Sequence, residues 1–442
     1  MSDRGLLPLY TAEEMKAAEA GHDVPTLMER AGRAVAEEAM RRYPDARSFA
    51  AVCGRGANGG DGRIALEVLR AAGKEAKEGT DGEVLIDALF GTGFRGEPRP
   101  EAAEKIEALN ASARPVVAVD LPSGVDADSG EVAGAAVRAD VTVTMHGRKV
   151  GLEVAPGRFN AGEVVVADIG LESRETTHRL ATPAVLDLVP RKVERDNKYS
   201  AGALLVVGGS PGMSGAVTLA ATAAFRADAG YVTVCSEVEP QLLEAVKRPL
   251  DDAVELVAKH DAIAIGPGLG RGPERQALVR RLLEETELPA VVDADALFEL
   301  QPLARTAPTV LTPHSGELDR LLGRGSEWVD AHRLEAVREA AATFRCVCLL
   351  KGADTLVASP AEGALVCRLT HPSLATAGTG DVLTGVIGAF LAKGMDAILA
   401  AAAAAIACDR AAGFGPARGL IASDVAALLP RALGENRGDG PL

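Results

Sequence analysis

Short apolar runs alternate with longer, mixed segments along most of the chain, and this alternation predicts the fold class. The runs are rich in Val, Ile, Leu and Ala, which is typical of strands buried on both faces of a parallel sheet. The segments between them have helical periodicity; one opens with the capping box Thr11–Glu14, and another ends before Gly394, a natural helix-terminating residue. The pattern therefore predicts an α/β protein. The strands that we predict are Phe49–Cys53, Val84–Asp87, Val116–Asp120, Asp140–Thr144, Val164–Asp168, Ala203–Val207, Val232–Cys235, Ala262–Ile265, Ala290–Asp293, Thr309–Leu311 and Val347–Leu350.

One polar, proline-containing stretch divides this pattern. Between Glu172 and Tyr199 the alternation stops, and after it the alternation resumes. Two α/β domains with a boundary near 172–190 are the simplest interpretation, and we predict domains at 1–175 and 190–442. They are not a tandem repeat, because their glycine-rich motifs differ.

Composition and charge narrow the classes of function. The 442 residues are 47% hydrophobic but only 3% aromatic, which suits a layered core of aliphatic side chains. The formal net charge of −15 argues against a protein that binds nucleic-acid backbones. The apolar stretch Ala397–Cys408 is shorter than the roughly twenty residues that cross a bilayer, and the N-terminus lacks the apolar core of a secretory signal. The six scattered cysteines are interpreted as buried apolar residues in a reducing compartment, so we expect a cytoplasmic protein without membrane or nucleic-acid partners.

A glycine-rich segment follows the first of these strands. Gly54–Gly59 matches the dinucleotide-binding pattern GxGxxG, and a helix is predicted directly after it at Arg63–Ala72. However, Asp61 places a carboxylate where a pyrophosphate would approach the helix N-terminus, so the match is weak. A second match, Gly91–Gly96, runs into Glu97–Pro100 instead of a helix and fails on context.

Polar side chains gather at the strand ends of this first domain. The residues concerned are Asn58, Asp61, Asp87, Asp120 and Ser123. In a doubly wound sheet the ligand crevice lies beyond the carboxyl ends of the strands, where these side chains would meet. Each taken alone is more often a turn or N-cap residue, but as a set they indicate a site.

The first domain resembles the NAD(P)H-hydrate epimerase domain, which has a Rossmann-like doubly wound sheet. Four motifs carry the resemblance, in the order Met28–Gly32, Asn58–Gly62, Val84–Gly93 and Asp120–Asp126. It implies a potassium ion held by Asn58, Asp87 and Ser123, and three oxygen donors suit such a hard cation. The residues that the resemblance assigns to the hydrated nicotinamide nucleotide are Asn58, Gly59, Gly60, Asp61, Gly91, Thr92, Gly93, Phe94, Arg95, Gly96 and Asp120.

The sequence departs from this family at two places. The family usually has a second Asn before Asn58, where Ala57 stands here. Only Gly73–Gly82 separates the first strand–helix unit from the next predicted strand, although the family normally places a further strand and helix there. We therefore expect a shortened first domain.

The second domain carries a glycine-lined turn before a predicted helix. The segment Ala375–Gly385 contains Gly378-Thr-Gly380 followed by Asp381. Free backbone N–H groups at a helix N-terminus can surround a phosphate, while Asp381 can accept a proton from a hydroxyl. The motif alone also fits an ordinary N-terminal turn in which an Asp interacts with the helix dipole.

Four further loops lie at the same predicted strand edge. They are Gly266–Gly270, Val291–Leu297 with two acids, Thr312–Glu317 with a His and a Glu, and Leu349–Thr355 with a Lys. A lone His314 is more often a turn residue, and a lone Lys351 a solvated strand end. Four loops at one edge nevertheless favour a site.

Together these loops resemble the ADP-dependent NAD(P)H-hydrate dehydratase domain, which has the ribokinase-like α/β/α sandwich fold. Leu205–Ser210 and Met213–Ala216 add to the resemblance. It implies Asp381 as the catalytic base, the amides of Gly378–Gly380 as an anion hole, ADP in preference to ATP as phosphoryl donor, and a magnesium ion on the phosphates. The residues that it assigns to the hydrated nucleotide are Ala216, Gly268, His314 and Asp381, and those that it assigns to ADP are Lys351, Gly352, Ala353, Asp354, Thr355 and Gly380.

The second domain also departs from this resemblance at three places. They are Asp228, where the family commonly has Gly, Arg368–His371, which lacks the usual Asn and Gly, and Cys408–Asp409, where His-Gly is frequent. All of them lie outside the glycine-lined turn before Asp381, so they bear on affinity more than on reaction type.

The two resemblances imply a single function, the repair of hydrated NAD(P)H. The first domain would interconvert the R and S hydrates, and the second would dehydrate the S form with ADP. We also expect a homo-oligomer. A kinase for a sugar or vitamin-precursor alcohol is an alternative, because it uses the same fold and the same Asp381 chemistry, but it has no evident need of the first domain. A third interpretation treats the first domain as a non-catalytic binding or scaffolding module, which the short Gly73–Gly82 connection favours.

Overall fold

The computed structural model describes residues 4–302, 304–361 and 363–434. The chain divides into two compact units. The smaller consists of Pro8–His178 with Asp330–Arg333, and the larger contains the chain up to Leu7, Arg179–Val329 and the chain from Leu334 onward. No helix of the described ranges is long and apolar enough to cross a membrane.

A parallel sheet forms the centre of the smaller unit. Its strands, in spatial order, are β3 (Glu75–Glu78), β2 (Ser48–Cys53), β4 (Val84–Ala88), β5 (Val116–Val119), β6 (Val141–Met145) and β8 (Glu163–Ala167). Every neighbouring pair in this sheet runs parallel. The chain order reverses between β2 and β4, so the switch point at which doubly wound sheets bind ligands lies between these two strands.

Helices cover both faces of this sheet, as a Rossmann-like doubly wound fold requires. The helices α2 (Val24–Arg42) and α3 (Ala57–Ala71) pack on one face, and α4 (Pro100–Ala111) packs on the other. Before them, α1 (Ala12–Glu19) begins at Thr11 with the predicted capping box. The end of β1 (Leu6–Tyr10) pairs in parallel with the short β7 (Arg148–Lys149), outside the main sheet.

The structure corrects one expectation for the smaller unit and confirms another in part. The helix after β2 begins at Ala57 and not at Arg63, so Asn58 and Asp61 lie in its first turns instead of in a loop. The segment after Gly73 contains a strand, β3, although it lacks a helix. The chain then returns to β4 directly across β2, and a Cβ at Gly82 would lie 2.5 Å from the backbone nitrogen of Ala50. Glycine therefore lets a short connection replace the helix.

The larger unit also contains a mainly parallel sheet. Its strands, in spatial order, are β12 (Val246–Arg248), β11 (Tyr231–Cys235), β10 (Ala203–Val207), β13 (Ala262–Ile265), β14 (Ala290–Val292), β15 (Thr309–Leu311), β16 (Val347–Leu350), β17 (Asp354–Ala358), β18 (Ala364–Arg368) and β9 (His178–Ala181). The strands from β12 to β16 are parallel, and β17 and β18 are antiparallel. Each strand predicted from the sequence is present in one of the two units, with ends shifted by no more than one residue.

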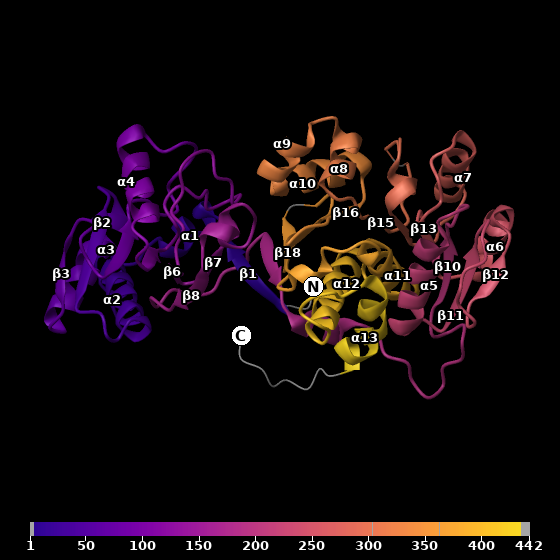
Figure 1. The fold of residues 1–442 in the computed structure, drawn as a ribbon, viewed down its shortest axis with the longest axis horizontal. Helices are drawn as coiled ribbons and strands as arrows, with labels where there is room; N and C mark the ends of the chain where they lie inside the picture. The colour runs from indigo at the N-terminus through magenta and orange to yellow at the C-terminus, as the bar shows by residue number, and fades with distance from the viewer. Residues whose placement is uncertain (1–3, 303, 362, 435–442) are drawn as a thin grey trace. The chain divides into compact units, whose positions relative to one another are not determined.

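Two layers of helices enclose this second sheet (Figure 1). One layer consists of α5 (Ser214–Arg226), α11 (Thr379–Ala392), α12 (Ala397–Gly413) and α13 (Ala422–Gly434). The other face is covered by α6 (Ala253–Leu256), α7 (Pro273–Glu284), α8 (Ser315–Leu322) and α10 (Arg333–Phe344). A short α9 (Ser326–Ala331) lies between α8 and α10 along the chain. This arrangement is the predicted α/β/α sandwich.

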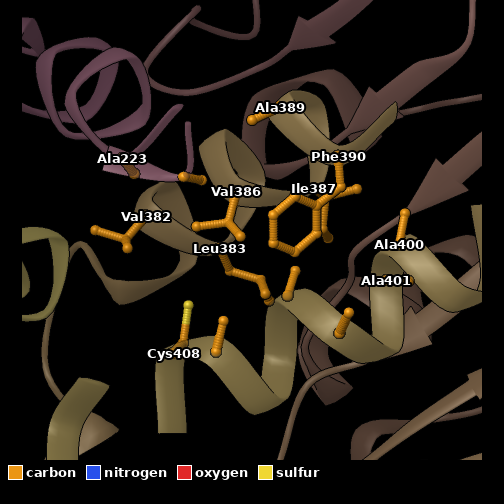
Figure 2. Close-up of a cluster of buried hydrophobic side chains, with 14 of the residues drawn as sticks. Ala223, Val382, Leu383, Val386, Ile387, Ala389, Phe390, Ala400, Ala401 and Cys408 are labelled. Carbon is orange, nitrogen blue, oxygen red and sulfur yellow. The ribbon is translucent and has the colours of Figure 1, made fainter. Parts of the chain in front are cut away.

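Small residues let the helices of the first layer approach closely. Figure 2 shows Leu383 and Phe390 of α11 pointing toward α12, which carries Ala400 and Ala401 on that side. All of them are buried. Large aliphatic and aromatic side chains on one helix thus pack against alanines on the next, which explains how so few aromatic residues can fill the core.

Substitution of Gly385 tests how closely α11 approaches α5. A Cβ at this position would lie 2.0 Å from the backbone oxygen of Ala220, so Gly385→Ala must push the helices apart. We expect the free energy of unfolding to fall by about 1–3 kcal/mol, as overpacking usually costs, although Ala favours a helix over Gly by about 1 kcal/mol.

The matched control is Gly215→Ala on α5, where a Cβ would meet nothing within 4 Å. It should leave stability unchanged or raise it. Urea denaturation that gives Gly385→Ala the same unfolding free energy as the unsubstituted chain would contradict the predicted close packing.

Candidate functional sites

A crevice opens at the switch point of the smaller unit. Its volume is about 1120 Å³, and it is lined by side chains from α1, α2, α4, the start of α3 and the loop after β4. Of the sequence-predicted binding residues, the lining contains Asn58, Asp61, Asp120 and Gly91–Arg95. The other predicted residues, Gly59, Gly60 and Gly96, do not belong to it. A Cβ at Gly59 would lie 2.0 Å from the oxygen of Gly54, so this glycine serves the packing of α3.

Asn58, Asp87 and Ser123 come together beneath this crevice. The Asp87 carboxylate, fully buried at the end of β4, accepts hydrogen bonds from the hydroxyl of Ser123 (2.6 Å) and from its backbone N–H (2.7 Å). Ser123 Oγ accepts in turn from the backbone N–H of Phe90 (3.0 Å), and the Asn58 amide donates to the backbone oxygen of Phe90 (2.8 Å). The start of α3, the end of β4 and the loop after β5 thus contribute one polar cluster.

This cluster fits the potassium ion that the sequence implied. Burial raises the pKa of Asp87 to about 6, although hydrogen bonds from Ser123 and Leu89 oppose the rise. No Lys or Arg of the described ranges forms an ion pair with Asp87. A monovalent cation between carboxylate, hydroxyl and amide oxygens would therefore neutralise a charge that the chain leaves uncompensated.

Asp61 faces the crevice in an unusual state for a carboxylate. Its Oδ1 is buried and has no hydrogen-bond partner within the described part of the chain. Burial and, to a lesser extent, the carboxylates of Asp120 and Glu19 together raise the pKa of Asp61 to about 8. Asp61 is therefore mostly protonated at neutral pH, when it can donate a hydrogen bond or a proton to a ligand.

Lys149, which the sequence did not single out, balances Asp120. Its ammonium group is fully buried and donates to Asp120 Oδ1 (2.5 Å), Thr144 Oγ1 (2.9 Å) and the backbone oxygen of Met145 (2.8 Å). Asp120 has a positive φ of 66°, a conformation that is uncommon outside Gly and clusters at functional sites. In the sequence, Arg148 and Lys149 are two adjacent basic residues, which is typical of a solvated turn. Only the folded chain shows that Lys149 is buried and paired with Asp120.

The loop after β4 forms one wall of the crevice. Phe90 and Phe94 stack with ring centroids 4.7 Å apart, which stiffens the loop around Thr92. Arg95 forms ion pairs with Asp126, at 3.4 Å, and with Asp128. The predicted binding loop is therefore held in shape by its own aromatic pair and by these acids.

A second cluster lies at the carboxyl ends of β14, β15 and β16 in the larger unit. Lys351 donates to Asp293 Oδ1 (2.9 Å) and lies 3.5 Å from Glu317 Oε2. The other oxygen of Asp293 accepts from Thr384 Oγ1 of α11 (2.7 Å). Although burial opposes it, these two carboxylates raise the pKa of Lys351, so the ammonium group stays charged. The sequence indicated the acids and Lys351 but gave no signal for Thr384.

Asp381 lies in the first turn of α11, next to this cluster. The helix begins after Gly378, which has a positive φ of 90°, and the first N–H groups of a helix have no partner within it. A Cβ at Gly380 would lie 3.5 Å from Lys351 Nζ and 3.8 Å from Asp293 Oδ2, so the lysine, the acid and the helix start adjoin. Burial raises the pKa of Asp381 to about 7, and the Asp293 carboxylate adds to the rise while Lys351 opposes it. A carboxylate with this pKa suits a general base at neutral pH.

Ala216, Gly268 and His314 lie around the same strand ends. Gly268 has a positive φ of 59°, and a Cβ added to it would lie 3.2 Å from the Cβ of Ala216. His314 caps α8, because its Nδ1 accepts from the backbone N–H of Gly316 (3.0 Å). Its side chain is 56% exposed, so capping leaves most of the ring accessible.

The segment Lys351–Thr355 forms a tight turn between β16 and β17. Thr355 Oγ1 donates to the oxygen of Gly352 (2.8 Å) and accepts from its N–H (3.3 Å). Both Asp354 and Thr355 are buried, so the turn can offer a nucleotide its backbone groups and the partly exposed side chain of Lys351.

The structure gives no dedicated cage for a divalent ion. No group of three or more His, Cys, Asp or Glu that could hold a metal occurs in the described ranges. Mg²⁺ normally keeps several waters and binds through substrate phosphates with one or two carboxylates, which the acids near Lys351 can supply.

Comparison with known proteins identifies relatives of both units. The family model described as NAD(P)H-hydrate dehydratase matches residues 204–429, and that described as YjeF-related protein N-terminus matches 24–78 and 73–151. Over nearly the whole chain, the sequence is similar to proteins named bifunctional NAD(P)H-hydrate repair enzyme. One from Coxiella burnetii is 35% identical over 93% of this chain and 95% of its own, and one from Moorella thermoacetica is 36% identical over 96% of both.

One solved structure is similar to the larger unit. It is an ADP/ATP-dependent NAD(P)H-hydrate dehydratase from Bacillus subtilis, co-crystallised with ATP and Mg²⁺. Its sequence is 30% identical, its TM-score is 0.52, and the match covers 56% of this chain and 95% of that one.

Replacing Asp293 tests the electrostatic coupling around Asp381. Asp293→Asn removes a like charge and leaves Lys351 to act on Asp381, so we expect the pKa of Asp381 to fall below its value of about 7. NMR titration of ¹³C-labelled Asp carboxyl groups measures this pKa. Asp251→Asn, an exposed change in the same unit, is the control and should not move it; an unchanged Asp381 titration in Asp293→Asn would refute the coupling.

Proposed function

Because the chain belongs to the family of bifunctional NAD(P)H-hydrate repair enzymes, we propose that each of its two sites carries one of the two reactions of that family. The cluster around Asp381 dehydrates the S hydrate of NADH or NADPH with ADP, and the crevice around Asp61 and Asp120 interconverts the R and S hydrates. The observation that carries the first assignment is a carboxyl group of raised pKa at a glycine-lined helix N-terminus, beside a charged lysine.

In the dehydration, Asp381 accepts the proton of the ring hydroxyl. The hydroxyl oxygen forms a bond to the terminal phosphorus of ADP, and the bond between that phosphorus and AMP breaks. The bond between the ring carbon and the phosphate oxygen then breaks, the neighbouring carbon gives up a proton to water, and the electrons of that C–H bond restore the double bond of NAD(P)H. No oxidant or reductant is needed, since a hydroxyl has only been converted into a better leaving group.

The other groups of this site hold negative charge. In this proposal the backbone N–H groups of Gly378–Gly380, at the start of α11, donate hydrogen bonds to the transferring phosphoryl group, where the helix dipole also acts. Lys351 can exchange its contacts with Asp293 and Glu317 for a phosphate oxygen of ADP. Mg²⁺, when bound to the phosphates, would neutralise further charge in the transition state.

In the epimerisation, the crevice of the smaller unit holds the hydrated nicotinamide ring near Asp61, Asp120 and Lys149. Asp61 is the group with a proton to donate, and the paired Asp120 and Lys149 keep the crevice polar without adding net charge. A potassium ion on Asn58, Asp87 and Ser123 would reduce the repulsion between this acidic crevice and an anionic dinucleotide.

Two other interpretations are less well supported. A sugar or vitamin-precursor kinase would explain Asp381 and Lys351 but not a first unit whose crevice carries its own proton-donating and ion-paired groups. A non-catalytic first unit was favoured by the short connection after Gly73, yet β3 is present and the crevice is walled on both sides of the switch point. The cytoplasmic location and the homo-oligomer stay predictions.

The variant Asp381→Asn tests the dehydratase assignment. It keeps the shape of the side chain but cannot accept the hydroxyl proton, so we expect turnover to fall roughly 10²–10⁴-fold, as loss of a general base usually causes. The assay incubates hydrated NADH with ADP and follows the recovery of NADH absorbance. Wild-type rates in this variant would refute Asp381 as the base, and no recovery by the unsubstituted chain would refute the function.

The potassium proposal is tested by the cation dependence of hydrate binding. We expect the dissociation constant to fall at least about tenfold, or 1.4 kcal/mol, when KCl replaces tetramethylammonium chloride at equal ionic strength. The effect should fade as the pH falls below about 6, where Asp87 takes up a proton. Asp87→Asn should abolish the difference, and Asp81→Asn, an exposed control in the same unit, should keep it. Binding by the unsubstituted chain that is indifferent to potassium would rule out this site.

A further inference from the structure

A carboxylate on α12 holds the segment that connects β18 to the start of α11. Asp409 Oδ1 accepts hydrogen bonds from the backbone N–H groups of Thr370 (2.8 Å) and His371 (3.0 Å), and Oδ2 accepts from the Thr370 hydroxyl (3.0 Å). The ring of His371 adds a contact from Nδ1 to Oδ1 at 3.1 Å. The residue itself is buried, with 11% of its side chain exposed.

The same segment is tied to the start of α11 at its other end. Thr379 Oγ1, in the first turn, donates to the backbone oxygens of Leu374 and Thr376, both at 2.9 Å. Between them the chain makes only a short 3-10 turn, Pro372–Leu374. Hydrogen bonds therefore link Asp409 through this segment to Thr379, the residue beside Gly380.

Regular secondary structure does not fix this segment. It leaves the sheet after Arg368, where β18 ends, and enters α11 only at Thr379. A segment without a backbone ladder depends on side-chain hydrogen bonds for its position. Asp409 satisfies two backbone donors at once, which an apolar residue in α12 could not do.

The ring of His371 is also seated on α12. A Cβ at Gly413 would lie 2.8 Å from its Nε2, so a glycine one turn after Asp409 leaves the room that the ring occupies. Gly in a helix costs about 1 kcal/mol relative to Ala, and the packing of the His371 ring explains why Gly413 is nevertheless present. The two residues form one face of α12 that receives the segment.

We propose that Asp409 is a positioning residue for the phosphoryl transfer: it fixes the segment 370–378 so that the amides of Gly378–Gly380 and the Asp381 carboxyl are correctly aligned. This rests on the proposed dehydratase function of the Asp381 site. Asp409 does not touch the reacting groups; it acts through the two hydrogen-bonded ends of the segment. Misplacement of reacting groups by about 1 Å can cost as much as 10²-fold in rate, so such a device has a measurable effect.

Kinetics of two variants in the full chain test the proposal. Asp409→Ala removes every acceptor, and we expect kcat for ADP-dependent dehydration to fall at least tenfold while KM for ADP and for the hydrate change less than threefold. Asp409→Asn keeps an oxygen that can accept from both backbone N–H groups, so its kcat should stay within threefold of that of the unsubstituted chain.

Three results would overturn the proposal. They are a folded Asp409→Ala with kcat within threefold of the unsubstituted chain, a change confined to KM, and an Asp409→Asn as slow as Asp409→Ala. If Asp409→Ala does not fold, Thr370→Val removes one of the same bonds at an exposed position, and kcat should fall at least twofold; an unchanged kcat overturns the proposal.

The matched control is Asp396→Ala at the other end of the same helix. Asp396 caps α12 by accepting from the N–H groups of Ile398 (3.1 Å) and Leu399 (3.2 Å), about 20 Å from Asp409 along the axis. Its loss should lower the melting temperature without changing kcat. This control therefore distinguishes a loss of α12 stability from a displacement of the start of α11. An unsubstituted chain that fails to dehydrate the hydrate refutes the proposed function, whereas an active one with an equally active Asp409→Ala refutes only the positioning role.

Discussion

Carboxylates at the carboxyl ends of buried parallel strands are the constraint on which both sites depend. A sheet covered by helices on both faces offers little water at its edge, so each acid there must be paired, protonated or neutralised by a bound cation. The chain uses the first two solutions at each site. Lys149 pairs with Asp120 in one, and Lys351 pairs with Asp293 in the other.

Beside each ion pair stands a second carboxyl group in the opening turns of a helix. Asp61 lies near the start of α3 and Asp381 in the first turn of α11, and burial raises the pKa of both, to about 8 and about 7. Burial thus gives one carboxyl group in each site a proton affinity near neutral pH, which suits a group that carries protons in catalysis. The resemblance is in physical arrangement, since the two sheets differ in strand order and the two motifs differ in sequence.

Local contacts also account for several departures from the family pattern. A short connection that passes β2 at Gly82 takes the place of the helix that the family resemblance implied after β3, and α1, α2 and α4 still line the crevice. In the larger unit, Asp228 has a positive φ of 75°, where Gly is common in the family, and it forms ion pairs with Lys192 and Lys393. Asp409 likewise accepts hydrogen bonds from the backbone N–H groups of Thr370 and His371. Both of these acids therefore have partners that compensate their charge or donate hydrogen bonds to it.

The sequence by itself determined the strands, the α/β class and most of the acids at the strand ends. Uninterrupted apolar runs have one stable environment, the buried interior of a parallel sheet, and an acid directly after such a run must lie at its edge. Only the tertiary structure decided that α3 begins at Ala57, that polar Glu75–Glu78 adds an edge strand, and that Lys149 is buried. The physical reason is that an edge strand, an ion pair and a pKa depend on groups distant in the chain. The local pattern of apolar residues predicts which side chains are buried, whereas the packing of the whole unit determines which partner a polar side chain contacts.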